Sequence, residues 1–380
     1  MKLILLSILI GAAILPLMAQ TTSTNSPTRE VRPNPPPPPV LSPEIETNRM
    51  VTFRLRAPNA HNVVVNGQWP DGHVSMTEDT NGVWSVTVGP VEPGIWEYSF
   101  QVDGLAMIDS GNPMIKPMRL PTTSILQIRG DPPLLWDFQN VPHGTVHLHT
   151  YYSTALNRVR NLVIYTPPGY EQKTKIKYPI LYLQHGYGDN QEAWVVHGKA
   201  NVILDNLIAQ GRAQPMIVVM MDGHAIAPVG NPETSYLQEN EKSFERDLFQ
   251  DAMPLVEKEY RVKSGSANRA IVGLSMGGGQ SLTIGLNHSD TFAWVGGFSS
   301  ATPSEAEIGA ALKNPSMLNH NLKLLWIGDG ESDFLLKRNE GFIALLREKN
   351  IRYEWHLTEG DHSWPVWRNY LIAFVPELFR

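Results

Sequence analysis

The sequence predicts an α/β domain preceded by a small all-β sandwich of the immunoglobulin-like type. From about residue 141 to the C-terminus, short apolar runs alternate with helical segments, which is typical of a parallel sheet covered by helices. From about residue 48 to 127, short runs of alternating polarity are separated by turn residues, which is typical of antiparallel strands. We therefore place the sandwich at 46–130 and the α/β domain at 131–380.

The sandwich is predicted from four runs of alternating polarity. We expect strands at 50–55, 63–65, 84–88 and 96–102. Asparagine-glycine, proline-glycine and aspartate-glycine pairs between them supply the positive φ angles that tight turns need, namely Asn66-Gly67, Asn81-Gly82, Pro93-Gly94 and Asp103-Gly104. Trp69, Trp84 and Trp96 could stack on a sugar, but we expect one or two of them in the core of so small a domain. For the sandwich as a whole we favour a structural or site-flanking role over independent glycan binding.

The N-terminal segment predicts where the protein works. A lysine is followed by an apolar run from Leu3 to Leu17 and by small residues near Ala19, which is the layout of a secretory signal peptide over residues 1–19. The run is short for a membrane span, so we expect no membrane association after cleavage. Residues 20–45, which contain Pro35 to Pro39, are expected to be a disordered linker. The expected location is secreted or periplasmic.

Composition excludes some classes of function. The chain has 380 residues and a formal charge of −6, which offers no basic footprint for nucleic acid. It has no cysteine, so it carries neither a disulfide nor a lipoprotein anchor, and its stability must come from packed cores. At 42% hydrophobic residues, two domains can each bury a core. The oligomeric state is left open.

A strand-turn-helix pattern predicts the nucleophile. Residues 270–272 read as a buried strand, Gly273-Leu274-Ser275-Met276-Gly277 as a sharp turn, and 278–282 as the start of a helix. This is the nucleophile elbow of the α/β-hydrolase fold, in which the flanking glycines let the serine hydroxyl stand exposed above the sheet. The N–H of Met276 would then face the developing oxyanion. A serine hydrolase is the leading interpretation.

The remaining catalytic groups follow in the order that this fold requires, serine, acid, histidine. His362 comes just after an expected last strand at 353–357, and it would act as general base and acid. Another expected strand at 322–327 precedes three carboxylates, those of Asp329, Glu331 and Asp333. We favour Asp333 because the acid must reach beyond the strand end, although spacing alone does not separate the three.

Further site residues are expected on neighbouring loops. The expected strand at 178–183 leads into a glycine-rich loop, where the N–H of Tyr187 is the candidate second oxyanion donor. Trp194 and Trp364 lie in loops that should converge on the site, and flat rings suit sugars and phenolic acyl groups. His224 ends a core strand at the catalytic side. We expect these last three to contact substrate.

No metal or other cofactor is expected. His143, His147 and His149 form a cluster, and the last two share one face of a strand. With no cysteine and no carboxylate at ligand spacing, a structural or solvent-facing role is favoured over a metal site.

These residues carry a resemblance to known families. The α/β domain resembles the family 1 carbohydrate esterases, which include feruloyl and acetylxylan esterases and are distantly similar to esterase D and the mycolyltransferases. The matching segments are 165–170, 185–189 with Trp194, 201–208, 215–219, 244–248, 268–278, 330–333, and His362 with Trp364 and Trp367. Segments 55–60, 82–84 and 98–104 resemble early-set immunoglobulin-like domains related to family 48 carbohydrate-binding modules.

The resemblance implies a secreted serine carboxylesterase that removes feruloyl or acetyl groups from plant cell-wall xylan through an acyl-enzyme on Ser275. It also implies Asp333 as the acid. The expected partners are feruloylated or acetylated xylan and its oligosaccharides. Alternatives are an esterase or acyltransferase of the same superfamily that acts on siderophore or simple acyl esters, and a glycan-binding protein without catalysis. The sequence does not separate feruloyl from acetyl preference, because that depends on loop shape.

Overall fold

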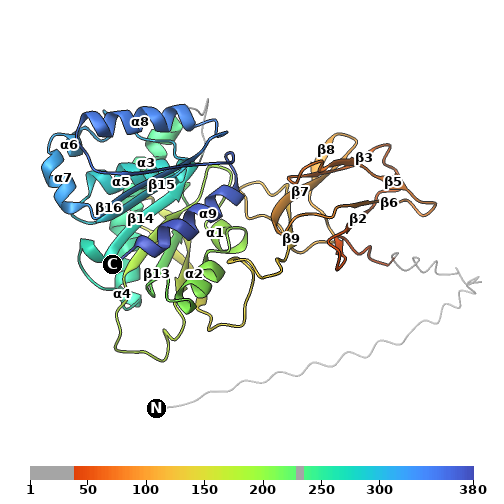
Figure 1. The fold of residues 1–380 in the computed structure, drawn as a ribbon, viewed down its shortest axis with the longest axis horizontal. Coiled ribbons are helices and arrows are strands. Elements are labelled where there is room, and N and C mark those ends of the chain that lie inside the picture. Colours follow the sequence, from red (N-terminus) through yellow and green to blue (C-terminus); the bar gives the residue numbers. More distant parts are fainter. Residues whose placement is uncertain (1–37, 228–234) are drawn as a thin grey trace, which may run out of the picture. The chain divides into compact units, whose positions relative to one another are not determined.

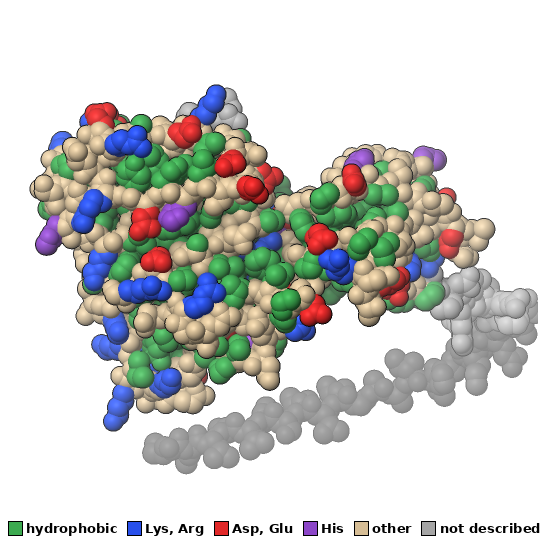
Figure 2. All heavy atoms as spheres, viewed as in Figure 1, with side chains coloured by type: hydrophobic (Ala, Val, Ile, Leu, Met, Phe, Trp, Pro, Cys, Tyr) green, Lys and Arg blue, Asp and Glu red, His purple; other side chains and the backbone are tan. Residues whose placement is uncertain are grey.

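The computed structural model describes residues 38–227 and 235–380 and confirms the predicted fold class (Figure 1). The expected signal peptide, 1–19, and most of the expected linker lie outside the described residues. Among the helices that the structure describes, none is both long and apolar enough to cross a membrane. Figure 2 shows both acidic and basic side chains on the face in view, with Lys and Arg more frequent over the lower part of the larger domain.

Two antiparallel sheets form the β domain. Their strand orders are β1-β2-β6-β5 and β4-β3-β7-β8, with β9 also paired to β7. The strands are β1 (Glu44–Ile45), β2 (Val51–Arg56), β3 (Val63–Gly67), β4 (His73–Ser75), β5 (Thr77–Glu78), β6 (Val83–Val88), β7 (Gly94–Val102), β8 (Leu105–Met107) and β9 (Ser124–Ile128). Every second residue of β2 is buried, as the alternating sequence predicts.

The core of the β domain uses two of the three tryptophans singled out from the sequence. Trp69 stacks on Phe53 with ring centroids 5.7 Å apart, and it is buried. Trp84 is buried too, and its Nε1–H donates to the carbonyl oxygen of Ala57 at 3.0 Å. Trp96 is partly buried and donates its Nε1–H to the backbone carbonyl oxygen of Glu92 at 2.8 Å. Trp69 and Trp84 therefore stabilise the domain, in line with the favoured structural role.

An eight-stranded sheet of order β10-β11-β13-β12-β14-β15-β16-β17 forms the centre of the second domain. The strands are β10 (Thr145–Ser153), β11 (Arg158–Thr166), β12 (Ile180–Gln184), β13 (Ile217–Met221), β14 (Arg269–Leu274), β15 (Trp294–Phe298), β16 (Leu324–Gly330) and β17 (Glu354–Thr358). The β10-β11 and β11-β13 pairs are antiparallel, and the other pairs are parallel. The central strands are buried on both faces, so they read as unbroken apolar runs.

Helices cover both faces of this sheet. One apolar core lies between the sheet and α3 to α8, and the other between the sheet and α1, α2 and α9, which cross in front of the strands in Figure 1. The helices are α1 (Ala193–Val196), α2 (Ala200–Ala209), α3 (Ser235–Asp247), α4 (Met253–Glu259), α5 (Ser275–Asn287), α6 (Gly309–Leu312), α7 (Pro315–Asn321), α8 (Leu336–Glu348) and α9 (Trp364–Phe374). A π-helical turn, Leu248–Ala252, joins α3 to α4.

The parallel order brings the loops of interest to one edge. Because β12, β14, β16 and β17 run in the same direction, the loops after Gln184, Leu274, Gly330 and Thr358 all leave the sheet at its carboxyl-terminal edge. Open α/β sheets bind ligands at this edge. Three of these loops carry residues that the sequence marks as catalytic.

The β domain contacts one of these loops, the loop after β12. Met118 forms a β-bridge with Asp189, and the N–H of Arg119 donates to the carbonyl oxygen of Gly188 at 3.1 Å. In addition, the buried side chain of Arg368 on α9 donates to the carbonyl oxygen of Ile95 at 2.8 Å. The segment that follows β8 therefore holds the loop after β12.

Candidate active site

Ser275 is the first residue of α5, directly after β14 ends at Leu274. Its φ of +52° lies in the left-handed region, which few residues other than glycine adopt. Such strain persists only where the surroundings enforce it, and it is common at active sites. A Cβ on Gly277 would lie 2.4 Å from the carbonyl oxygen of His185, and one on Gly273 would lie 2.5 Å from Gly277. Both glycines are therefore required by close packing.

The structure brings Ser275, His362 and Asp333 together. His362 Nε2 lies 3.0 Å from Ser275 Oγ, and its Nδ1 lies 2.8 and 3.0 Å from the two carboxylate oxygens of Asp333. With Nδ1–H donating to the carboxylate, Nε2 is left to accept the serine proton. This is the geometry of a serine nucleophile with a base and a group that orients the base.

Asp333 is held in its ionised form. Burial disfavours the charge, but hydrogen bonds from His362 and from the N–H of Leu335 outweigh it and lower the pKa of Asp333. Its side chain is fully buried, whereas that of His362 is 17% exposed. The imidazole therefore lies between a buried negative charge and the open site.

The structure also separates the three carboxylates that spacing left open. Strand β16 continues to Gly330, three residues past the expected end at 327, so Asp329 lies inside the strand and is completely buried. Burial and the neighbouring charge of Asp333 raise the pKa of Asp329. Glu331 is exposed. Of the three, only Asp333 is hydrogen-bonded to His362 in the described chain.

The two backbone N–H groups predicted for the oxyanion hole are those of Met276 and Tyr187. That of Met276 lies in the first turn of α5, where N–H groups have no acceptor within the helix. Tyr187 lies three residues after β12, and its loop is fixed by His185. His185 Nδ1 is 2.8 Å from the carbonyl oxygen of Gly186, and its Nε2 accepts the N–H of Gly223 at 2.8 Å.

His224 does not lie in the pocket, which corrects the expected substrate contact. It is buried, with Nε2 2.8 Å from the carbonyl oxygen of Tyr187 and Nδ1 2.8 Å from the hydroxyl of Tyr236. Burial, with a smaller contribution from the charge of Arg119, lowers the pKa of His224 to about 4. A neutral ring donates from one nitrogen and accepts at the other, which matches these two partners. His224 thus positions the Tyr187 loop.

Trp194 and Trp364 do not line the pocket either, although both were expected to contact substrate. Both are only 1% exposed, and their rings pack edge to face with centroids 4.9 Å apart. Trp194 donates its Nε1–H to the carbonyl oxygen of Gln184 at 2.9 Å, at the end of β12. They belong to the core under the loop and do not face substrate. Sequence shows that an aromatic residue is near a site, but not which way its ring turns.

The histidine cluster is structural in the described residues. His143 lies 2.9 Å from Asp205, His147 lies 3.0 Å from Thr166, and His149 lies 2.5 Å from the hydroxyl of Tyr260. Within residues 38–227 and 235–380, no group of three or more potential ligands could hold a metal ion.

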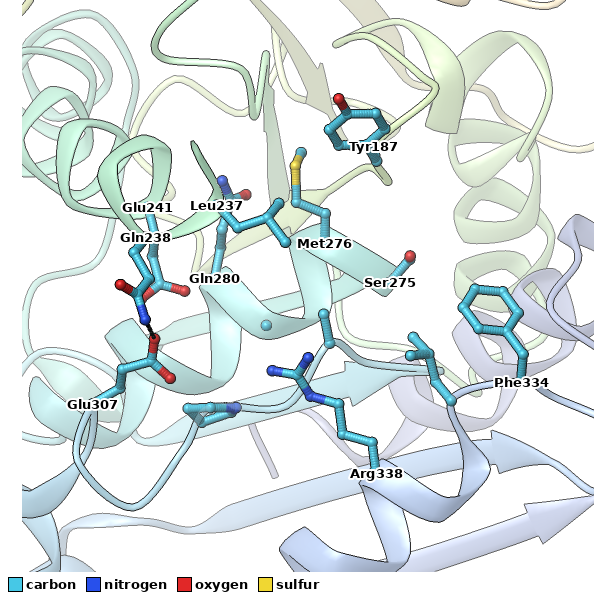
Figure 3. A pocket seen from close by; sticks show the side chains of 14 residues that line it. Tyr187, Leu237, Gln238, Glu241, Ser275, Met276, Gln280, Glu307, Phe334 and Arg338 are labelled. Carbon is cyan, nitrogen blue, oxygen red and sulfur yellow. Dashed lines mark hydrogen bonds between the residues drawn. The ribbon is translucent and has the colours of Figure 1, made fainter. Parts of the chain in front are cut away.

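A pocket of about 360 Å³ opens next to Ser275, a size suited to a small organic group (Figure 3). Its lining residues come from α3, α5, α8 and the loops after β12, β15 and β16, namely Tyr187, Leu237, Gln238, Glu241, Ser275, Met276, Gly279, Gln280, Ala301, Pro303, Glu307, Phe334, Leu335 and Arg338. Only Ser275, Met276 and Tyr187 were expected from the sequence. The others carry no motif, because each comes singly from a different segment.

The geometry agrees with comparisons to known proteins. A family model described as "Putative esterase" matches residues 153–378, which is more than half of the chain. The chain belongs to this esterase family. It is a carboxylic ester hydrolase with an α/β-hydrolase fold.

Two relatives of this esterase are named as feruloyl or ferulic acid esterases. An endo-1,4-beta-xylanase/feruloyl esterase of Xylanibacter ruminicola is 30% identical over 348 residues, which cover 89% of this chain and 46% of that protein. The chain thus spans less than half of that relative. A CE1 ferulic acid esterase from Anaeromyces mucronatus, solved with ferulic acid, has 25% identity and a TM-score of 0.57 over 64% of this chain and 93% of its own.

A third comparison covers the β domain as well. The enterobactin esterase of Shigella flexneri has a TM-score of 0.62 and 20% identity, over 87% of this chain and 93% of its own. At this identity the likeness concerns the fold alone. It supports the arrangement of a small β domain before the hydrolase fold.

Proposed function

We propose that this esterase removes hydroxycinnamoyl groups such as ferulate from plant cell-wall xylan through an acyl-enzyme on Ser275. The observation that carries the proposal is the pocket beside Ser275, which is far larger than an acetyl group needs. Its walls near the serine are apolar, from Leu237, Met276 and Phe334. A flat aromatic acyl group would bury its ring there and keep its carbonyl at the nucleophile.

In the first half-reaction, Ser275 Oγ attacks the ester carbonyl carbon while His362 Nε2 takes the serine proton. The carbonyl oxygen becomes an oxyanion that accepts hydrogen bonds from the N–H groups of Met276 and Tyr187. The carbon-oxygen bond to the sugar then breaks. The leaving sugar oxygen takes the proton from His362, and the acyl group stays on Ser275.

In the second half-reaction, a water replaces the sugar. His362 takes one water proton while the water oxygen attacks the acyl carbon, and the proton then returns to Ser275 Oγ as the bond to the acyl group breaks. Asp333 stays ionised and stabilises the imidazolium in both halves. The products are the free acid and the regenerated serine.

The relatives support the substrate class. The Xylanibacter protein joins a xylanase to a feruloyl esterase by name, and the Anaeromyces enzyme was solved with ferulic acid. We further propose that residues 1–19 direct export and are removed, and that the domains divide at about residue 130. Most of 20–45 would form a linker, although its last two residues, Glu44–Ile45, form β1 of the β domain. The β domain, which resembles family 48 carbohydrate-binding modules, would support the catalytic loops rather than bind glycan independently.

Hydrolysis of methyl ferulate and of an acetylated xylooligosaccharide by wild type and Ser275→Ala tests the proposal. We expect wild type to release ferulate and Ser275→Ala to release none. Ferulate release unaffected by Ser275→Ala would refute the serine mechanism. Acetate release without ferulate release would overturn the acyl specificity.

A further inference from the structure

The end of the pocket remote from Ser275 is polar. Figure 3 shows the Ser275 hydroxyl on one side of the cavity and Gln238, Glu241 and Glu307 on the other, with Leu237 and Met276 between them. Gln238 donates to a carboxylate oxygen of Glu307 at 3.3 Å. An acetyl group would not reach this end. The polar residues there must therefore be explained by a longer ligand or by structure alone.

Glu241 is the member of this group that faces the core of the domain. It lies on α3, and one of its carboxylate oxygens accepts a hydrogen bond from the hydroxyl of Thr283 on α5 at 3.1 Å. That is the only hydrogen bond to this carboxylate from residues 38–227 and 235–380. An ionised carboxylate can accept about four hydrogen bonds, so Glu241 can still accept hydrogen bonds from a ligand in the pocket.

The distance between the Glu241 carboxylate and Ser275 can be estimated along helix α5, which both residues contact or belong to. Ser275 begins the helix, and Thr283 follows eight residues later. At a rise of 1.5 Å per residue, eight residues correspond to about 12 Å along the axis. Glu241 therefore marks a point roughly two helical turns beyond Ser275, along the floor of the pocket.

This separation matches a hydroxycinnamoyl group. Ordinary bond lengths place its para-oxygen about 8 Å from its carbonyl carbon. Adding about 3 Å at each end, for the approach of the serine and for a hydrogen bond, gives roughly 13 to 14 Å. A planar acyl group lying along α5 would thus carry a para-hydroxyl to the Glu241 carboxylate while its ring contacts Leu237 and Met276.

We propose that Glu241 is a specificity-determining residue that accepts a hydrogen bond from the para-hydroxyl of the acyl group, so that the enzyme selects free phenols such as ferulate and p-coumarate. The proposal rests on the proposed function, because it assigns part of the same pocket. The charge around Glu241 supports it. Enclosure by protein raises the pKa of Glu241 to about 7, with Thr283 opposing and Glu307 adding to the rise. Such a carboxyl gains from a new donor.

The test compares methyl p-coumarate with methyl cinnamate, which differ only by the para-hydroxyl. In wild type, kcat/KM for p-coumarate should exceed that for cinnamate by roughly 10-fold or more, the usual effect of one hydrogen bond to a charged group. In Glu241→Leu the ratio should fall toward one. In Glu241→Gln it should be intermediate, because the amide oxygen still accepts. Glu239→Gln is the matched control, since Glu239 lies exposed on the same helix outside the pocket lining.

Hydrolysis of 4-nitrophenyl acetate reports separately whether each variant is folded and has a working triad. A wild-type ratio near one, or a ratio kept in an active Glu241→Leu, overturns the role of Glu241 and leaves the proposed function standing. Wild type that cleaves 4-nitrophenyl acetate but neither cinnamate ester overturns both.

Discussion

The imidazole of His224 lies 2.8 Å from the carbonyl oxygen of Tyr187, so a buried histidine from the loop after β13 holds the backbone of the loop after β12. The N–H that is proposed to bind the oxyanion belongs to the same residue, Tyr187. A displacement there of about 1 Å is costly in the transition state, in which the donor must already be aimed. The histidine acts by position and does not touch the reacting atoms.

We therefore expect His224→Phe to lower kcat by roughly 10-fold or more with a smaller change in KM, because one oxyanion donor contributes about 10²-fold or more. Steady-state kinetics with methyl ferulate measures the split. Tyr236→Phe, which removes only the hydroxyl at His224 Nδ1, should have a smaller effect. Equal loss of kcat in both variants, or a change in KM alone, would contradict the positioning role.

The site residues that could be predicted are those whose position depends on residues close to them in the sequence. The elbow could be predicted because the glycines that allow the strained serine stand within two residues of it, at Gly273 and Gly277. Met276 follows from the same turn. His362 could be predicted because a histidine after the last strand of this fold faces the serine whatever the details of the loop.

Other features depend on contacts between distant segments, which a single sequence does not display. Trp194 and Trp364 look like substrate platforms in the sequence, but in the structure their buried rings pack against each other. Glu241 stands in a charged amphipathic helix with nothing to distinguish it from the exposed Glu239. Only the packing of α3 against α5 gives one of these two carboxylates a place in the pocket.

Asp333 and Asp329 should respond differently to substitution by asparagine. Asp333→Asn should lower kcat by roughly 10⁴-fold, because the amide favours the wrong tautomer of His362. Asp329→Asn should keep most of the activity near pH 7, because the raised pKa of Asp329 already favours the neutral carboxyl. Comparable losses in the two variants would show that Asp329 also acts as an ionised acid.

The same raised pKa predicts the pH dependence of stability. The folded state holds the Asp329 proton more tightly than the unfolded chain, so stability falls as pH rises from the ordinary carboxyl range through the folded pKa. In Asp329→Asn this part of the decline should disappear. Urea unfolding of both proteins at pH 5 and pH 9 measures it. Parallel declines in the two proteins would contradict the assignment.

Lys116 is expected to stabilise the contact between the β domain and the Tyr187 loop. Its ammonium is largely buried, 2.9 Å from Glu97 and 3.6 Å from Asp189. Burial raises the pKa of Asp189, and Lys116 opposes that rise. Lys116→Met would remove the cation that contacts both Glu97 and Asp189, which should cost roughly 3 kcal/mol of unfolding free energy. Lys116→Met/Asp189→Asn should recover part of it. No recovery would show that the unpaired charge of Asp189 is not what destabilises Lys116→Met.

The pKa of Glu241 predicts that selectivity for a free para-hydroxyl depends on pH. The pKa of this carboxyl is set by burial and by the groups around it. These groups are Thr283 on α5, Glu307 in the loop after β15, Glu245 on α3 and Arg338 on α8. Above about pH 7 it is ionised and makes a stronger, charge-assisted hydrogen bond to the phenol. The ratio of kcat/KM for methyl p-coumarate to methyl cinnamate should therefore rise between about pH 6 and pH 8.

The ratio isolates Glu241, because titration of His362 affects both esters equally and cancels. Glu241→Gln carries no titrating group at this position, so its ratio should stay flat across the same range. Because Glu307 also faces Glu241, Glu307→Gln should lower the midpoint of the rise by removing a neighbouring negative charge. A wild-type ratio that stays flat, or a rise that persists in Glu241→Gln, would place the titrating group elsewhere.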